Sequence, residues 1–519
     1  MSEFAWKTRL PSYLRVEQDR IEAIARGYGL DFFPTAFEMA SYDEMNELAA
    51  LGGFPTRYPH WRFGMEYERL SKSAEYGLSR IYEMVINNNP AYAYLLEGNS
   101  LTDQRLVMAH VYGHVDFFKN NFCFRTTDED TLGKRIDPIP NRPDYSPSRR
   151  WIDRFANHGS RISRHISRFG IDKVESFIDH CLSLENLIDP WQPYRGRFTR
   201  PDETQEDEPI EVPRLAAKDY MDKFINPEEY LAAKRKSMEA EREKKKGFPA
   251  QPLRDVLAFL LEHAPLERWE RDVLTAIRTE AFYFVPQMQT KIMNEGWASY
   301  WHSRMMTEKI LTTPEIVDYA DRNASVLATS AGQLNPYKLG VELYRNIEER
   351  WNRGQFGREW GECKNYDERR YWDMKVGLGR EKIFQVRALY NDVTFIDEFL
   401  TPEFAAEQKL YTFGYSGKSD QWEIESRKFS EVKEKLLFQL TNFGSPIIQV
   451  IDANFGNRGE LLLKHDHQGV DLQKDYAQSA LEALVRCWKR PCAVASHVDK
   501  KAVLLRYDGH HHSEQAYTV

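Results

Sequence analysis

The 519-residue sequence lacks long hydrophobic runs, and its few cysteines form no pattern. No apolar stretch approaches the roughly 18 residues that a membrane-spanning helix needs. The five cysteines are scattered, odd in number and never in CxxC spacing, which is typical of a reducing compartment rather than of a disulfide framework. The first residues contain no basic segment followed by an apolar one, so no secretory signal is expected. We therefore expect a cytoplasmic protein without a membrane span.

An excess of positive charge is also absent, since the formal net charge is −8 and the isoelectric point is near 6.0. This balance argues against a nucleic-acid partner, because such proteins usually present a basic surface. The sequence contains no Walker phosphate loop, no GxGxxG fingerprint and no GxSxG elbow. Aromatic residues, in contrast, make up 13% of the chain, and 42% is hydrophobic, so a large folded core is expected rather than disorder.

Hydrophobic periodicity predicts a mainly α-helical protein followed by a small C-terminal α+β domain. Residues 1–120 are predicted to be mostly helical, with helices at 14–28 and 66–88 and a third that opens with a capping box at Ser100 and Asp103. We expect a helical domain at 1–410, containing a charged excursion at about 195–250, and an α+β domain at 411–519.

The last part of the chain has β-branched apolar runs separated by turn residues. Strands are predicted at 445–452 and 460–465, an amphipathic helix at 472–489, and a hairpin at 492–497 and 502–507. His465 and His467 have the spacing of one strand face, and we interpret them as surface or edge residues rather than metal ligands.

Two histidines one helical turn apart give the first clue to function. His110 and His114 share a face with apolar residues, and side chains at i and i+4 lie about 5–6 Å apart at Cβ, close enough to bind one ion. The alternative is a pair of core histidines whose nitrogens are satisfied by backbone or carboxylate partners. Asp116, two residues further on, is expected to orient an imidazole or to support the turn.

A second helical segment nearly two hundred residues later places Glu295 and His302 on its apolar face. Burying a carboxylate is unfavourable unless it is paired or binds a cation. We predict that His110, His114 and Glu295 bind a divalent metal, with zinc as the expected ion, and that His302 lies close by as a supporting or acid–base residue. The alternative is a buried Glu–His or Glu–Arg pair that joins two helices.

The predicted site departs from the zinc peptidase pattern HExxH in one position. In that pattern the residue after the first histidine is a glutamate that deprotonates metal-bound water, but this chain has Val111 there. Glu280 is the candidate for a replacement base, although a salt bridge explains Glu280 equally well. That this protein is an enzyme, a metal-dependent hydrolase without the usual HExxH base, is therefore a hypothesis.

Three sequence blocks resemble those of the SpoVR family (stage V sporulation protein R), and the resemblance extends over nearly the whole chain. The blocks are residues 58–64, 110–121 and 290–302. The family resemblance implies a link to spore cortex formation and stationary-phase physiology, with a PrkA-type serine kinase and a von Willebrand A-type protein as partners. The Glu-Gly-Trp-Ala string at 295–298 is more distantly similar to the glutamate helix of gluzincin-type metallopeptidases, which implies a gluzincin-like helical core and Glu295 as a ligand.

Two main functional hypotheses follow. The first is a metal-dependent hydrolase that acts on a peptide or amide linked to the cell wall, the spore cortex or stationary-phase physiology. The second is a non-catalytic regulatory or scaffold protein that works with the kinase and the von Willebrand A-type protein. A third, an oxygenase-like helical protein with two metals, requires more buried carboxylates than the sequence lets us pair.

Overall fold

The computed structural model describes residues 10–75, 83–129, 148–195, 212, 221, 226–245, 248–329, 334–417 and 420–517. The chain forms two compact units. One contains Met1–Leu132, Ile136–Arg164 and Phe282–Gly444, and the other contains Gly133–Arg135, His165–Ala281 and Ser445–Val519. The division of the chain into a domain at 1–410 and a domain at 411–519 stays a prediction.

The predicted fold class is confirmed: the described chain is mainly helical and has a small α+β part near its C-terminus. Much of the predicted charged excursion lies outside the described residues, but α9 (Glu228–Lys245) falls within it. None of the helices in the described ranges is both long enough and apolar enough to cross a bilayer.

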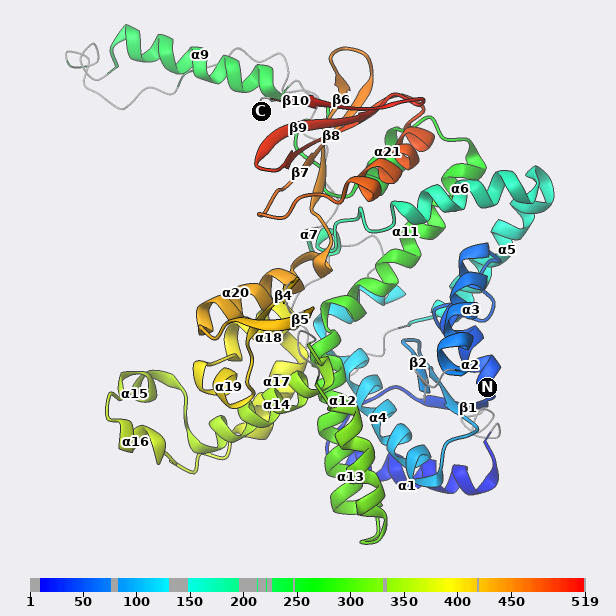
Figure 1. Ribbon diagram of the computed structural model, residues 1–519, viewed down its shortest axis with the longest axis vertical. Coiled ribbons are helices and arrows are strands. Elements are labelled where there is room, and N and C mark those ends of the chain that lie inside the picture. Colours follow the sequence, from blue (N-terminus) through cyan, green and yellow to red (C-terminus); the bar gives the residue numbers. More distant parts are fainter. Residues whose placement is uncertain are drawn as a thin grey trace. The chain divides into compact units, whose positions relative to one another are not determined.

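The first unit is built around helices α4 (Leu101–Asn120), α12 (Lys291–Met305) and α14 (Pro336–Arg353), with α12 packed against both of the others (Figure 1). The predicted capping box opens α4, since the Ser100 hydroxyl accepts from Asp103 N and the Asp103 carboxylate accepts from Ser100 N. The other helices of this unit are α1 (Ser12–Gly27), α2 (Tyr42–Ala50), α3 (Trp61–Glu75), α13 (Glu315–Val326), α15 (Gly357–Glu362), α16 (Tyr366–Arg370), α17 (Gly379–Leu389), α18 (Asp392–Phe399), α19 (Pro402–Glu407) and α20 (Phe429–Leu440).

Glycines allow these helices to approach closely. A Cβ atom added at Gly113 of α4 would lie 2.7 Å from Cα of Ala298 in α12. A Cβ atom added at Gly340 of α14 would lie 2.7 Å from Cα of Gly296 in α12. Real side chains do not tolerate such distances, so glycine at these positions sets the spacing of the three helices.

A three-stranded sheet in the first unit was missed by the sequence analysis. β1 (Thr35–Ala40) pairs in parallel with β3 (Ala91–Leu96), and β2 (Glu83–Ile86) pairs with the other edge of β3 in antiparallel orientation. The prediction of a helix at 66–88 is therefore wrong at β2 (Glu83–Ile86); α3 extends to Glu75, and residues 76–82 lie outside the described part of the chain. β2 has only four residues, too few for a strand periodicity to stand out beside a helical segment. A hairpin of β4 (Thr412–Ser416) and β5 (Gln421–Ser426) was also missed.

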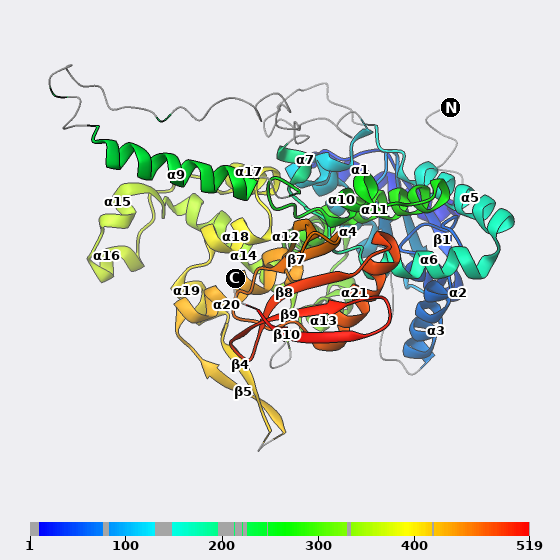
Figure 2. The ribbon, with the colours of Figure 1, turned by 90° about the horizontal axis from the view of Figure 1, so that it is seen from above.

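The second unit contains a five-stranded sheet in the order β10-β9-β8-β7-β6, and α21 (Lys474–Trp488) packs against β8 and β9 (Figure 2). The predicted strands correspond to β6 (Ile448–Phe455), β7 (Glu460–His465), β8 (Cys492–Val498) and β9 (Lys501–Tyr507), and only β10 (His512–Ala516) was not predicted. This unit also holds α6 (Ile171–Ser183), α7 (Gln192–Arg195) and α10 (Val256–His263), whereas α5 (Trp151–Phe169) and α11 (Arg268–Gln289) each contribute residues to both units.

Candidate metal centre

The face of α4 that packs toward α12 carries His110 and His114, both of which are buried. Their ring centroids are 4.5 Å apart and their planes are nearly perpendicular, at 87°. Helical geometry places side chains four residues apart on the same face, so α4 alone sets the spacing of the two imidazoles.

Glu295 on α12 reaches both imidazoles. Its Oε2 atom lies 3.6 Å from His110 Nε2 and 3.5 Å from His114 Nε2. This oxygen is buried and has no hydrogen-bond partner among the described residues. The structure therefore brings together the three residues that the sequence predicts as metal ligands, around a carboxylate oxygen that is otherwise unsatisfied.

A second carboxylate joins the cluster from β2. Glu83 Oε1 lies 3.6 Å from His110 Nε2, and donor atoms of Glu83, His110 and His114 all lie within 4.8 Å of one another. Atoms that share one tetrahedral zinc ion at bonds of about 2.0–2.2 Å are roughly 3.3–3.6 Å apart. The three carboxylate–imidazole separations of 3.5–3.6 Å match this spacing, so these residues fit the donor set of a tetrahedral ion.

Glu83 could not be predicted as part of the site from the sequence, because its position depends on tertiary pairing. Glu83 begins a four-residue strand, and its backbone is fixed by the antiparallel register with Leu95 of β3. The one available signal was the alternation of Ala and Tyr in 91–94, which matches the alternating burial of β3. That pattern indicates a strand at 91–96 but says nothing about which residue pairs with it.

The remaining imidazole nitrogens are oriented by neighbours on α12 and α13. His114 Nδ1 donates to Asn294 Oδ1 at 2.9 Å, and His110 Nδ1 lies 2.9 Å from His302 Nδ1, where one ring donates and the other accepts. His302 Nε2 in turn lies 3.4 Å from Asn323 Oδ1. These contacts leave Nε2 of His110 and His114 directed at the carboxylates, an arrangement that outer-sphere partners produce in metal sites.

Burial and charge set the protonation states in the cluster. Burial raises the pKa of Glu295, but His114 and His110 together outweigh this effect and lower the pKa to about 2. Burial and the neighbouring His110 lower the pKa of His114 to about 4. Metal ligation requires an ionised carboxylate and a neutral imidazole, and the lowered pKa values of Glu295 and His114 agree with this requirement. Burial lowers the pKa of His110, but Glu83 and Glu295 outweigh burial and raise it, so an ion at the site would have to displace a proton that His110 holds more tightly than usual.

Two further groups face His110. Burial raises the pKa of Glu83 to about 7; His110 opposes this rise, and Glu295 adds a smaller one. The ring of Tyr337, near the start of α14, stacks 6.3 Å from the ring of His110, and burial and Glu295 raise the pKa of its hydroxyl. Sequence reasoning missed Tyr337 because nothing in its local pattern connects it to the histidines.

The other predicted residues lie elsewhere. Val111, where HExxH has its glutamate, is fully buried in the hydrophobic core. Glu280 is buried on α11 and belongs to the second unit, whereas the cluster lies in the first, so its role as a base stays a prediction. His465 and His467 lie in the second unit, where His465 Nδ1 contacts Ser496 Oγ at 2.9 Å and His467 Nε2 contacts Asp471 Oδ1 at 2.7 Å.

Asp116 does not orient either histidine but joins α4 to its neighbours. Both oxygens of its carboxylate accept a hydrogen bond from Arg387 Nη1 on α17, each at 2.8 Å. The Oδ2 atom also accepts from the indole N–H of Trp297 on α12 at 2.7 Å. The backbone N–H of Asp31 donates to the same group at 2.7 Å. This buried network holds the two helices of the cluster in register, so the role of Asp116 is structural.

Comparison with known proteins supports the family resemblance that the sequence shows. Residues 9–445 match the family described as "SpoVR like protein". The chain is 28% identical over 515 residues to "Uncharacterized protein YcgB" of Escherichia coli (strain K12), an alignment that covers 90% of this chain and 92% of that protein. No solved structure matches the chain. The chain belongs to the SpoVR family.

Proposed function

We propose that this protein is a metal-dependent hydrolase that acts on a peptide or amide in the cytoplasm. The observation that carries the proposal is the convergence of two imidazole nitrogens on the unsatisfied Oε2 atom of Glu295, at 3.5 and 3.6 Å. A buried carboxylate oxygen that makes no hydrogen bond is destabilising, and a cation between it and the two imidazoles would relieve this effect. The similarity of residues 295–298 to the gluzincin glutamate helix supports the same role for Glu295.

Zinc is the proposed metal because a set of imidazole and carboxylate donors at tetrahedral spacing suits it. His110, His114 and Glu295 would hold the ion, and a bound zinc would supply a Lewis acid that lowers the pKa of water and polarises a carbonyl group. His302 and Asn294 fix the ring orientations of the two histidines through their Nδ1 atoms.

Glu83 is the proposed proton acceptor in place of the missing HExxH glutamate. It enters the cluster from β2, and its carboxylate is as near to His110 as that of Glu295, at 3.6 Å. The Tyr337 hydroxyl, which faces the same cluster, is suited to donate a hydrogen bond to a developing oxyanion. The proposed substrates are linked to the cell wall, the spore cortex or stationary-phase physiology, as the family resemblance implies.

Hydrolysis of a mixed peptide library by the zinc-loaded chain tests this function. We expect Glu83→Gln to keep its zinc and lose at least about 100-fold in rate, the usual effect of removing a general base. Glu295→Gln should lose both zinc and activity, whereas Glu97→Gln, an exposed control, should change neither. Full activity of Glu83→Gln would contradict the role of Glu83, and zinc-loaded wild-type protein without hydrolytic activity would contradict the hydrolase.

The second candidate is a regulatory or scaffold protein that works with a PrkA-type kinase and a von Willebrand A-type protein. Val111 favours it, since a buried valine at the position of the usual base cannot accept a proton. In that case the metal cluster joins β2, α4 and α12 without catalysis. Affinity purification of the kinase distinguishes the scaffold from the hydrolase. If the protein is a scaffold, His110→Ala should weaken recovery of the kinase, and the wild-type protein should show no hydrolysis of the peptide library.

A further inference from the structure

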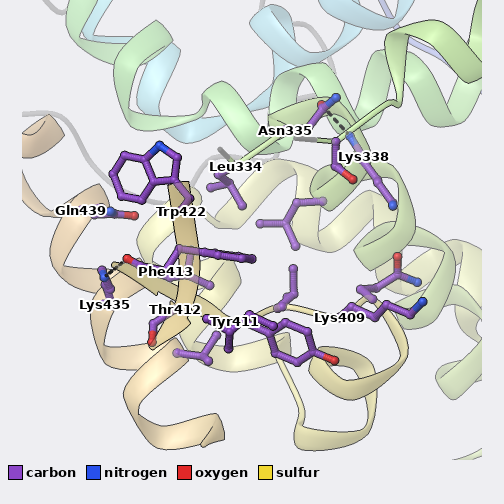
Figure 3. A pocket seen from close by; sticks show the side chains of 17 residues that line it. Leu334, Asn335, Lys338, Lys409, Tyr411, Thr412, Phe413, Trp422, Lys435 and Gln439 are labelled. Atoms are coloured by element: carbon purple, nitrogen blue, oxygen red, sulfur yellow. Dashed lines mark hydrogen bonds between the residues drawn. The ribbon is translucent and has the colours of Figure 1, made fainter. Parts of the chain in front are cut away.

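A cavity of about 590 Å³ lies in the first unit, and none of its lining residues belongs to the metal cluster. It is enclosed by the start of α14, the segment 408–413, the β4–β5 hairpin and α20 (Figure 3). Small-molecule sites in proteins usually have volumes of about 300–1,000 Å³. The cavity is therefore large enough for a ligand of ordinary size.

The interior of the cavity is mostly apolar. Aliphatic and aromatic side chains from four elements line it, among them Leu339, Leu410, Phe413, Trp422, Val432 and Leu436. The Trp422 side chain remains 51% exposed and Ile424 42% exposed at the β5 wall. Exposed apolar residues that gather at a concave site indicate a surface that a ligand covers.

The polar part of the lining is basic. Of the described residues that line the cavity, three are lysines and none is acidic. Lys435 Nζ is occupied by the Phe413 carbonyl at 3.0 Å and by Glu425 at 3.3 Å. The ammonium groups of Lys338 and Lys409 have no ion pair or hydrogen bond to any described residue.

The two unpaired lysines lie on the same side of the cavity. Figure 3 shows Lys338 and Lys409 there, and Phe413 and Trp422 toward the other side, where Gln439 and the already paired Lys435 also lie. Lys338 lies in the first turn of α14, an 18-residue helix whose N-cap residue Asn335 accepts a hydrogen bond from Lys338 N at 3.1 Å. The positive end of the helix dipole adds to the two lysine charges. One side of the cavity thus attracts an anion, and the other favours an apolar group.

We propose that this cavity binds an amphipathic carboxylate of the medium-chain fatty acid class. Its carboxylate would lie between Lys338 and Lys409, and its hydrocarbon chain would cover Phe413 and Trp422. The site differs from the proposed metal centre and does not depend on it. Tyr337, which faces His110, precedes Lys338 in the same turn, so a ligand here contacts the helix end that borders the metal cluster.

Isothermal titration of the full chain with dodecanoate below its micelle concentration tests the proposal, with dodecanol as the uncharged analogue. We expect saturable binding of dodecanoate at one site per chain and weaker binding of dodecanol. The double variant Lys338→Gln/Lys409→Gln should lose at least fivefold in affinity for dodecanoate and little for dodecanol. Lys364→Gln/Lys464→Gln, two exposed lysines outside the cavity lining, should bind dodecanoate like wild type.

Leu436→Trp, which fills the apolar part, should abolish binding of both ligands; thermal unfolding of each variant shows whether it has folded. If Leu436→Trp does not fold, the lysine variants alone decide. The proposal is overturned if dodecanoate does not bind saturably, if dodecanol binds as tightly as dodecanoate, or if Lys338→Gln/Lys409→Gln binds dodecanoate like wild type.

Discussion

Asp116 shows how single buried charges position the metal cluster. Its carboxylate is fully buried and pairs with Arg387 of α17 while it also accepts from Trp297 of α12. Removal of one partner leaves a buried charge without compensation, which is strongly unfavourable. The residues that orient the site therefore include one that touches no donor atom of the cluster.

We expect Asp116→Asn to lower the free energy of unfolding by about 3–5 kcal/mol, because Arg387 would remain buried without an anion. Urea denaturation of the metal-free protein measures this change. Glu349→Gln is the matched control, since its pair with Arg353 is exposed and should contribute less than about 0.5 kcal/mol. Equal effects of the two substitutions would contradict the structural role of Asp116.

Asp392 gives the protein a specific pH dependence. Its carboxylate accepts from the backbone N–H groups of Ile292 and Met293 at the start of α12, and burial raises its pKa to about 7, although these bonds and Lys291 oppose the rise. In the unfolded chain, the carboxyl group of Asp392 ionises near pH 3.9. Because the folded protein binds this proton more tightly than the unfolded chain, protonated Asp392 stabilises the folded state. This stabilisation is complete below about pH 3.9 and is lost as the pH rises through about 7.

Relative to Asp392→Asn, which cannot titrate, the wild-type protein should lose roughly 1–3 kcal/mol of unfolding free energy between pH 5 and pH 8. Denaturant unfolding of both proteins at four pH values across this range measures the difference. The difference isolates Asp392 because the other titrating groups are common to both proteins. A difference that does not change with pH would contradict the raised pKa.

At the scale of elements, the contact of α12 with α14 sets where Glu295 lies. Gly296 follows Glu295 directly and faces Gly340, and a Cβ atom at Gly340 would come within 2.7 Å of Gly296 Cα and still closer to the Ile292 carbonyl. Backbone atoms cannot move aside as a flexible side chain can. A side chain at either position must therefore separate the two helices.

Gly340→Ala should lower the free energy of unfolding by at least about 1–3 kcal/mol through overpacking, and weaken zinc binding by displacing α12. Thermal unfolding and competition with a zinc-binding dye measure the two effects. Gly361→Ala on α15 is the control, since its added Cβ meets open space and the change should be neutral or stabilising. Unchanged zinc affinity in a destabilised Gly340→Ala would contradict the link between helix spacing and the site.

Elements with a clear periodicity or clear turn residues at their ends could be predicted from sequence, and the sheet of the first unit could not. α4 and α12 are long and carry clear apolar faces, and the C-terminal strands have β-branched residues bounded by turn residues. β2 has four residues, so its strand periodicity is too short to recognise. Because Glu83 reaches His110 only through the pairing of β2 with β3, this second carboxylate of the cluster could not be inferred from local pattern.

At the scale of the whole molecule, the metal cluster joins segments far apart in the chain. Glu83, His110 and Glu295 come from β2, α4 and α12, all within the first of the two compact units. A ligand that binds only the folded state stabilises it in proportion to the logarithm of its concentration. An ion at the cluster should therefore raise the free energy of unfolding of the first unit and leave that of the second unit unchanged.

We expect added zinc to raise the midpoint of thermal unfolding of the chelator-treated protein, and His114→Ala to abolish this rise. Hydrogen exchange should show the added protection in α4, β2 and α12, with none in α21 of the second unit. His263→Ala, a histidine of the second unit, is the control and should respond to zinc like wild type. Zinc-induced protection confined to the second unit would place the ion elsewhere.

The most direct test of the metal centre is the metal content of the purified full-length protein, measured by inductively coupled plasma mass spectrometry after dialysis. We expect about one zinc ion per chain in the wild type and in His263→Ala, and less than about a tenth of that in His110→Ala, His114→Ala and Glu295→Gln. A wild-type protein that holds no stoichiometric metal even after zinc loading, or a zinc content that these three substitutions leave unchanged, would contradict the account.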